Sequence, residues 1–338
     1  MIEHLDQAVQ NALTDLLSAS LSPAFDGKGV TFPTKTIGGK KYIYVAAKVG
    51  SIPMQRYLGP DDAETRALLD QERELWKSSE TSRITRARLV NMILVGGALG
   101  PTPQEGKVLR LLERGGVFIA GGVLVGTPAF RTLGSMLGVA WEGQFATRDV
   151  DIAAEYKLPV AVKQKPIDLK SIILESKMGF LEIPTLNRKH PSTSYKMKGG
   201  DFKVELLTPE RGKPSNQPIL IRSLRAMAEP LRYLDYLIQE TQPAVVPFGI
   251  GVLVNVPDPG RFAIHKLVVS QRRPANAMTK SVKDIDQARQ LLEVLIDIRP
   301  GSIYAAIEAA NSMDKKFMRQ CKAASKQLPG DIQKALTA

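Results

Sequence analysis

A short alternating segment in the middle of the chain constrains the fold more than any other feature. Residues 147–152 read Thr-Arg-Asp-Val-Asp-Ile, which alternates acidic and aliphatic side chains. Because successive side chains of a strand point to opposite faces, this pattern predicts a strand with Asp149 and Asp151 on one face. Two neighbouring carboxylates repel each other and are costly to bury, and a divalent cation such as Mg²⁺ removes that cost. A half-exposed edge strand with a solvated acidic face is the alternative interpretation.

A pair of glycines precedes this segment. Residues 117–120 (Val-Phe-Ile-Ala) predict a buried strand that runs into Gly121 and Gly122, and the small apolar residues 123–139 predict a helix after it. Glycine lets the backbone approach a ligand closely, and a helix N-terminus favours phosphate. Phosphate binding and a simple tight connection between strand and helix both stay open at this point.

The glycine segment matches neither of two common nucleotide-binding motifs. Gly121 and Gly126 have the spacing of a P-loop, but Thr127 and Pro128 stand where Lys followed by Ser or Thr is required. Val123 occupies the position of the second glycine in the dinucleotide-binding fingerprint. A P-loop and a Rossmann site are therefore excluded.

A third acid lies in another predicted strand, residues 202–207, where Glu205 is the one acidic residue among aliphatic neighbours. An unpaired buried carboxylate is costly, so a core position does not explain it. If this strand lies beside that of Asp149 and Asp151, Glu205 completes a cluster of three carboxylates. Such a cluster can hold a metal ion or accept the proton of an attacking hydroxyl. A Glu205 that faces water or pairs with a lysine is the other interpretation.

The rest of the chain predicts an α+β protein in three parts. We expect a helical and β-hairpin module over residues 1–100, a core with a mixed sheet flanked by helices over 101–217, and a basic helical module over 218–338. The hairpin carries Tyr42, Tyr44 and Tyr57 interleaved with lysine and arginine. These rings can stack on nucleic-acid bases, or they can serve only the packing of the hairpin itself.

The chain of 338 residues has a formal net charge of +12, which favours a polyanionic partner: nucleic acid, nucleotide or an acidic membrane surface. Its single cysteine excludes a disulfide framework and a cysteine zinc site, and three separated histidines argue against a histidine metal site. No apolar stretch is long enough to span a bilayer, and the N-terminus lacks a signal-peptide pattern. We therefore expect a cytoplasmic protein without a membrane partner.

The order of these motifs resembles the nucleotidyltransferase fold of the polymerase-β-like superfamily. Residues 121–130 and 147–151 are similar to segments of bacterial stand-alone nucleotidyltransferase-like proteins, as are residues 57–60 and 263–269, and a more distant similarity is to AbiEii-type toxins. The specific motifs lie within residues 115–210. The chain departs from the compact members in the 27 positions between Gly122 and Asp149, and in having Glu205 where many members have Asp.

The resemblance implies an enzyme that transfers a nucleoside monophosphate from a nucleoside triphosphate to an acceptor hydroxyl, with release of pyrophosphate. Asp149, Asp151 and Glu205 would be the catalytic residues and would hold Mg²⁺ or Mn²⁺. The residues expected to bind the nucleotide are Gly121, Gly122, Thr127, Arg148, Lys266 and Arg273.

Several of these nucleotide contacts have competing interpretations. Lys266 lies in an apolar helix and can instead extend its ammonium group to water. Arg273 can instead stabilise the C-terminus of that helix, and Arg148 can be a solvent-facing charge at the edge of a strand.

The positive charge favours an RNA acceptor such as tRNA, and the similarity to toxins suggests an antitoxin or a neighbouring defence protein as a partner. Two other functions stay open: a catalytically silent nucleic-acid-binding or regulatory protein, and a small-molecule nucleotidyltransferase. The sequence does not identify the nucleotide, the acceptor, the partner or the oligomeric state.

Overall fold

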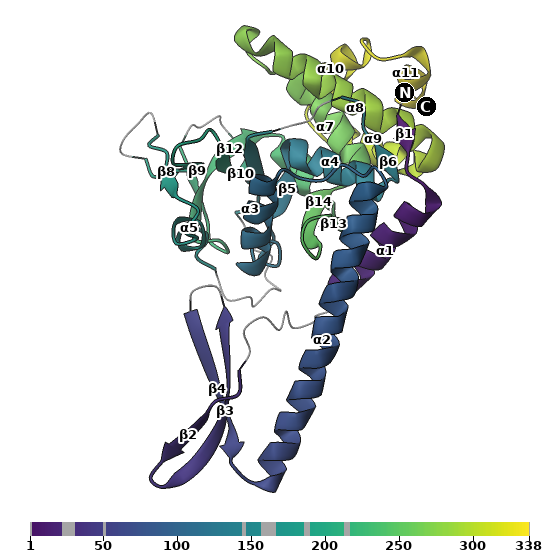
Figure 1. Cartoon of the computed structure of the whole chain (residues 1–338). Helices are drawn as coiled ribbons and strands as arrows, with labels where there is room; N and C mark the ends of the chain where they lie inside the picture. The colour runs from purple at the N-terminus through teal and green to yellow at the C-terminus, as the bar shows by residue number, and fades with distance from the viewer. Residues whose placement is uncertain are drawn as a thin grey trace.

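The computed structural model describes residues 2–21, 31–49, 52–143, 147–156, 167–185, 190–212 and 217–337. It has the predicted α+β architecture, with a mixed sheet of seven strands surrounded by helices and a long arm that extends from them (Figure 1). The fold class expected from the sequence is confirmed.

The central sheet has the strand order β11-β12-β10-β7-β5, and β8 and β9 pair beside the first half of β10. The strands are β5 (Val123–Val125), β7 (Asp149–Ala153), β8 (Phe180–Glu182), β9 (Ser194–Met197), β10 (Lys203–Glu210), β11 (Ile219–Ile221) and β12 (Ala226–Arg232). Strand β10 runs parallel to both β7 and β12, whereas β5 runs antiparallel to β7. The two strands that carry the predicted acids, β7 and β10, are therefore direct neighbours.

Alternation along these strands supplies the core. Val150 and Ile152 of β7, and Val204 and Leu206 of β10, are fully buried, while the acids between them are only half-buried. The hairpin of β13 (Thr241–Val246) and β14 (Val252–Pro257) continues the core beyond β5, because Asn255 donates hydrogen bonds to the carbonyls of Phe118 and Gly122.

Helices of two groups surround the sheet. The first group comprises α3 (Pro103–Arg114), α4 (Gly126–Met136), α5 (Leu169–Leu174) and α6 (Leu234–Ile238). The second comprises α7 (Pro259–Ser270), the short 3-10 helix η1 (Ala275–Ala277), α8 (Met278–Ile298), α9 (Pro300–Asn311), α10 (Lys315–Ser325) and α11 (Gly330–Ala335). Helix α7 packs against α8, α9 and α10, and buried residues of this group join the same hydrophobic core as the sheet.

The N-terminal part forms the arm. Strand β1 (Glu3–His4) pairs with β6 (Val139–Ala140), and α1 (Gln7–Leu21) packs against the C-terminal part of α2 (Ala63–Val95). Helix α2 then projects away from the core, and a three-stranded sheet of β2 (Thr34–Ile37), β3 (Lys40–Val49) and β4 (Ile52–Pro60) lies beside its distant N-terminal part (Figure 1).

Helix boundaries follow the capping residues that the sequence offers. Asp62 accepts a hydrogen bond from the backbone N–H of Thr65 and begins α2, and Thr102 does the same for Glu105 at the start of α3. Residues 63–95 form one continuous helix, because no glycine or proline interrupts them.

Three local predictions are wrong. Residues 117–121 form turns, and the strand comes after the two glycines, at 123–125, so that the helix begins only at Gly126. Residues 219–257, which were predicted to be mainly helical, contain four strands before α7 begins. The predicted boundary at residue 217 also falls within the central sheet, because β11 and β12 belong to it.

Among the described residues, no helix is both long enough and apolar enough to cross a bilayer.

Candidate functional site

The register of β7 and β10 brings the three predicted acids to one face of the sheet. Asp151 lies opposite Glu205, and Asp149 lies opposite Lys203, in a parallel pair. Partners in such a ladder share a face, and residues two apart on one strand do as well. Asp149, Asp151 and Glu205 therefore form one acidic cluster, which we call the carboxylate cluster.

Asp151 is the most buried member of this cluster. Its Oδ1 is buried and has no hydrogen-bond partner within the described part of the chain. Burial, reinforced by the neighbouring charges of Asp149 and Glu205, raises the pKa of Asp151 from 3.8 to about 7. At neutral pH the carboxyl of Asp151 is therefore only partly ionised, because the nearby positive charges do not offset its burial and its acidic neighbours.

The other two acids have polar partners of their own. Asp149 accepts a hydrogen bond from the hydroxyl of Thr147, two residues earlier in the chain. Glu205 accepts one from the Nζ of Lys203 at 2.9 Å, which is the lysine pairing that the sequence left open. Only one of the three carboxylates, that of Asp151, is left with a buried oxygen to satisfy.

The glycine that touches this cluster is Gly126. Its φ is +70°, and a Cβ built on it would lie 2.6 Å from Oδ2 of Asp151. Any larger residue would thus both strain the backbone and collide with the carboxylate. Gly126 is also the first residue of α4, and the buried Thr127 follows it, so the N-terminus of that helix lies against Asp151.

Gly121 and Gly122 lie elsewhere. Strand β5 pairs Val125 with Asp151 and Val123 with Ala153, so the two glycines that precede Val123 lie at the end of β5 away from the acids. Gly122 is needed for close packing, because a Cβ there would come within 2.7 Å of the side chain of Val117. The structure therefore brings Gly126 and Thr127 to the cluster, and not the glycine pair that the sequence indicated.

Two cations from the C-terminal helices are held by one buried acid. Asp284 of α8 accepts from Lys266 Nζ at 2.7 Å and from Arg273 Nε at 2.8 Å. These cations hold the pKa of Asp284 below its usual range although burial opposes this. The positive charge of Lys266 partly offsets the upward shift in the pKa of Asp151, so Lys266 on α7 faces the carboxylate cluster. Of the three cations proposed for the nucleotide, Lys266 interacts with the carboxylate cluster and is neutralised in part by Asp284, to which Arg273 is also bound.

Lys283, the residue before this acid, is a functional candidate that we did not select from the sequence. Burial, together with the charge of Lys266, lowers the pKa of Lys283, while Asp149 acts in the opposite direction. No ion pair of Lys283 is found among the described residues. A half-buried cation beside Asp149 is available for an anionic ligand, and no sequence pattern distinguished it from the other lysines.

Arg148 does not join the site. Its side chain is 78% exposed and forms an ion pair with Asp201 at 2.8 Å. This agrees with the interpretation of Arg148 as a solvent-facing charge at the edge of the strand.

A buried ion pair joins the two helices α3 and α4 near the site. Arg131 of α4 donates to Glu105 of α3, and both side chains are almost completely buried. Burial raises the pKa of Glu105 even though Arg131 opposes the shift, and the charge of Asp149 contributes to it. Helix α4, which carries Gly126 at its N-terminus, is thus tied to α3 by a pair of charges.

His265 is a core residue. It is buried in α7, its Nε2 makes no hydrogen bond within the described ranges, and burial lowers its pKa to about 3. The imidazole is neutral at physiological pH, as a core histidine should be.

The carboxylate cluster fits a divalent cation by its chemistry. Three carboxylates on one face, one with an unsatisfied buried oxygen, are the donors that Mg²⁺ prefers. In this structure Thr147 and Lys203 engage two of them, and no set of three His, Cys, Asp or Glu side chains in the described ranges already has a metal-binding arrangement.

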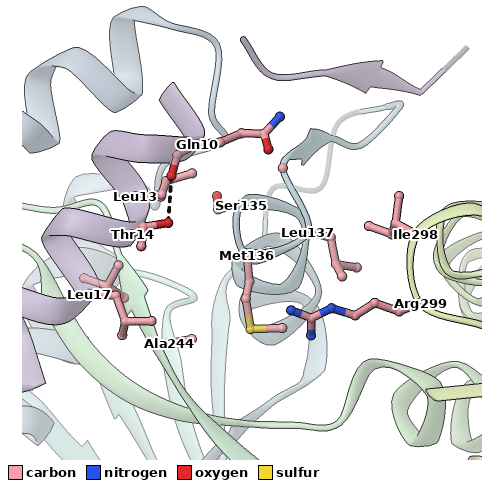
Figure 2. A pocket seen from close by; sticks show the side chains of 12 residues that line it. Gln10, Leu13, Thr14, Leu17, Ser135, Met136, Leu137, Ala244, Ile298 and Arg299 are labelled. Carbon is pink, nitrogen blue, oxygen red and sulfur yellow. Dashed lines mark hydrogen bonds between the residues drawn. The ribbon is translucent and has the colours of Figure 1, made fainter. Parts of the chain in front are cut away.

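A cavity of about 230 Å³ lies elsewhere, between α1, the end of α4, β13 and the end of α8 (Figure 2). Apolar side chains such as Leu13, Leu17 and Met136 line it together with polar ones, among them Gln10 and Arg299. None of the residues that line it is a candidate site residue, so the carboxylates and not this cavity locate the site.

Comparisons with known proteins identify the family of the chain. A family model described as "Nucleotidyltransferase" matches residues 104–311, which is more than half of the chain and includes all three acids. The chain is also similar to a solved structure, an antigenic nucleotidyltransferase-like protein from Paracoccidioides brasiliensis, with 14% identity and a TM-score of 0.37 over 71% of this chain and 95% of that one. No curated protein matches the sequence.

Proposed function

Because the chain belongs to this nucleotidyltransferase family, we propose that it transfers a nucleoside monophosphate from a nucleoside triphosphate to an acceptor hydroxyl. One observation carries the proposal: the carboxylate cluster meets the N-terminus of α4 at Gly126, where Oδ1 of Asp151 is buried without a partner. A site for a triphosphate needs carboxylates for the cation and backbone N–H groups for the phosphates, side by side.

The roles of the residues follow from their positions. Asp149, Asp151 and Glu205 would hold Mg²⁺ or Mn²⁺, which when bound supplies charge neutralisation on the attacking and leaving oxygens. The backbone N–H groups of Gly126 and Thr127 would bind phosphate oxygens, since Pro128 has none, and Lys283 and Lys266 would face the negative charge of the triphosphate. Glu205, whose side chain is a third exposed, is placed to accept the proton of the acceptor hydroxyl.

The raised pKa of Asp151 makes metal binding at this site depend on pH. Asp151 holds a proton up to about pH 7 in the free protein, and a cation must displace that proton. Metal binding should therefore release a proton and tighten as pH rises.

We further propose that the acceptor is an RNA and that the protein acts in the cytoplasm, where triphosphates and RNA occur together. The net charge of +12 supports a polyanionic acceptor. A setting in toxin–antitoxin or defence systems, with an antitoxin as partner, is supported only by the similarity of the motifs to such toxins.

A direct test is to incubate the full-length protein with Mg²⁺, total tRNA and each of the four α-labelled triphosphates in turn. Label in RNA supports the proposal and identifies the nucleotide. Label that appears only in a purified metabolite fraction indicates a small-molecule nucleotidyltransferase. RNA binding without incorporation of any nucleotide indicates the silent nucleic-acid-binding protein and contradicts the proposed activity.

Substitution of Gly126 distinguishes the effect of contact with Asp151 from the effect of backbone strain. We expect Gly126→Ala to abolish nucleotide incorporation, because its Cβ would displace the carboxylate of Asp151. Gly121→Ala is the matched control, since Gly121 has a φ of +90° but nothing within 4 Å of its added Cβ. Both variants should lose about 1–2 kcal/mol of stability from the left-handed backbone, measured by urea unfolding. Equal activity losses in the two would show that strain, and not contact with Asp151, is responsible.

Substitution of Lys283 tests the triphosphate contact. Lys283→Met should raise the KM for the triphosphate about tenfold or more, as loss of a charge-assisted contact does, while the melting temperature changes little. Lys280→Met is the control, because Lys280 is exposed and lies on the same helix without any link to Asp149. An unchanged KM in Lys283→Met would remove this lysine from the site.

A further inference from the structure

The three-stranded sheet of the arm has two unlike faces. On the inner face, Ile43 is buried and lies opposite Gly59, and a Cβ at Gly59 would collide with the side chain of Thr65. Thr65 and Leu69, on the first turns of α2, are also buried. The inner face therefore packs closely on α2 and leaves the other face pointing away from the helix.

The outer face carries three tyrosines. Strand pairing places Tyr44 opposite Tyr57 and Tyr42 opposite Lys35, all on this side of the sheet. The ring of Tyr57 lies 6.0 Å from that of Tyr42 and 5.6 Å from that of Tyr44, and the Nζ of Lys35 is 5.0 Å from the centre of the Tyr44 ring. The rings thus pack on one another, but Tyr57 keeps 52% of its surface exposed.

The charged residues of this sheet are all positive. Residues 31–60 contain five lysines and arginines and no aspartate or glutamate. Lys35, Lys40 and Lys41 are exposed. An exposed aromatic platform on a sheet whose own charged residues are all positive is typical of surfaces on which unpaired bases stack while cations follow the phosphates.

We propose that this outer face of the arm binds an unpaired segment of RNA, and that it holds the acceptor of the reaction. The second clause rests on the proposed function; the first does not. Tyr57 supplies the exposed stacking surface, and Tyr42 and Tyr44 orient it. Lys35 and Lys40 contact the backbone from the same face, and Lys41, exposed at the same end of the sheet on the opposite face, adds to the positive field.

The length of the arm specifies what kind of acceptor fits. Helix α2 has 33 residues, which at a rise of about 1.5 Å each make about 50 Å, and the sheet lies at the end of α2 distant from the core (Figure 1). Because the carboxylate cluster lies in the core and the sheet of the arm lies beside the distant part of α2, a ligand that contacts both must be extended. A structured RNA with a loop and a free end meets this requirement, and a small metabolite does not.

The test measures binding alone, with full-length protein, a fluorescein-labelled RNA hairpin and fluorescence anisotropy, without triphosphate. Tyr57→Leu should weaken binding about fivefold or more through lost stacking, whereas Tyr57→Phe should stay within about twofold of the wild type. The triple variant Lys35→Gln/Lys40→Gln/Lys41→Gln should weaken binding and reduce the slope of log K against log salt by about 2. Circular dichroism confirms that each variant keeps its helix content.

The matched control removes three exposed lysines from α10, with Lys315→Gln/Lys316→Gln/Lys322→Gln. Equal losses in the two triple variants would overturn the proposal, because they would show that only overall charge matters. Binding to phosphatidylglycerol vesicles with no binding to the hairpin would also overturn it.

The outcomes separate this proposal from the proposed function. Hairpin binding through the arm with no nucleotide incorporation leaves the RNA surface established and contradicts the enzyme. Incorporation into RNA that is unchanged in Tyr57→Leu and in the arm triple variant supports the enzyme and contradicts the role of the arm.

Discussion

Asp151→Asn should abolish nucleotide incorporation and, in the same protein, raise the stability of the metal-free fold above pH 7. Activity should fall by more than about 100-fold, since the loss of outer partners of a metal already costs 10–100-fold. Stability should rise because asparagine occupies nearly the same volume without the charge that Asp149, Glu205 and burial disfavour. A gain in stability together with a loss of activity is typical of a residue retained for function.

The pH dependence of this effect has a definite sign. The pKa of Asp151 is about 7 in the folded protein and near 3.8 in the unfolded chain, so between these values the folded state binds a proton that the unfolded state lacks. The contribution of Asp151 to stability is therefore complete below about pH 4 and is lost as pH rises to about 7. Thermal melts of wild type and Asp151→Asn should coincide near pH 4, diverge progressively up to about pH 7 and stay apart above it, with the variant melting higher.

Mg²⁺ provides a second measurement that does not depend on turnover. A cation that binds only the folded state raises its melting temperature, so Mg²⁺ should stabilise the wild type at pH 8 and have much less effect on Asp151→Asn. Asp201→Asn is the control, because Asp201 is exposed and pairs with Lys196 and Arg148 outside the carboxylate cluster. If Asp151→Asn is no more stable than the wild type at pH 8, the buried and uncompensated state of this carboxyl is refuted.

Arg131→Met should cause the largest loss of stability among these variants. It leaves Glu105 without its partner in an almost completely buried position, and removal of one member of a buried ion pair costs about 3–5 kcal/mol. Because burial already raises the pKa of Glu105, the variant should lose further stability as pH rises, when Glu105 must ionise without Arg131. Urea unfolding at pH 5 and pH 8 measures both effects.

Two further variants make this prediction specific. Arg131→Met/Glu105→Gln should recover much of the stability, because it removes the unpaired charge. Arg211→Met breaks the half-exposed pair of Arg211 with Glu155 and should cost less than about 1 kcal/mol. Equal costs for Arg131→Met and Arg211→Met would mean that the buried pair contributes no more than a surface contact.

The sequence alone determined the parts of the site that depend on alternation within one strand. The acidic and aliphatic residues of 147–152 predicted a strand with Asp149 and Asp151 on one face, and the aliphatic residues around Glu205 predicted a second strand. The structure decided that these two strands are neighbours. Both predictions followed because side chains alternate between the two faces of a strand and because an unpaired buried carboxylate is costly. The capping residues Asp62 and Thr102 were predictable for the same local reason.

Only the tertiary structure decided which glycine and which lysine belong to the cluster. Residues 121–126 offer three glycines, and the antiparallel register of β5 with β7 selects Gly126, a choice that no local pattern makes. The charges of Lys283 and Asp149 interact although the two residues are far apart in the sequence, and the strands after residue 218 form because β12 completes the sheet beside β10. The spacing of residues along the chain determines local geometry, whereas contacts between distant segments depend on how all the elements pack together.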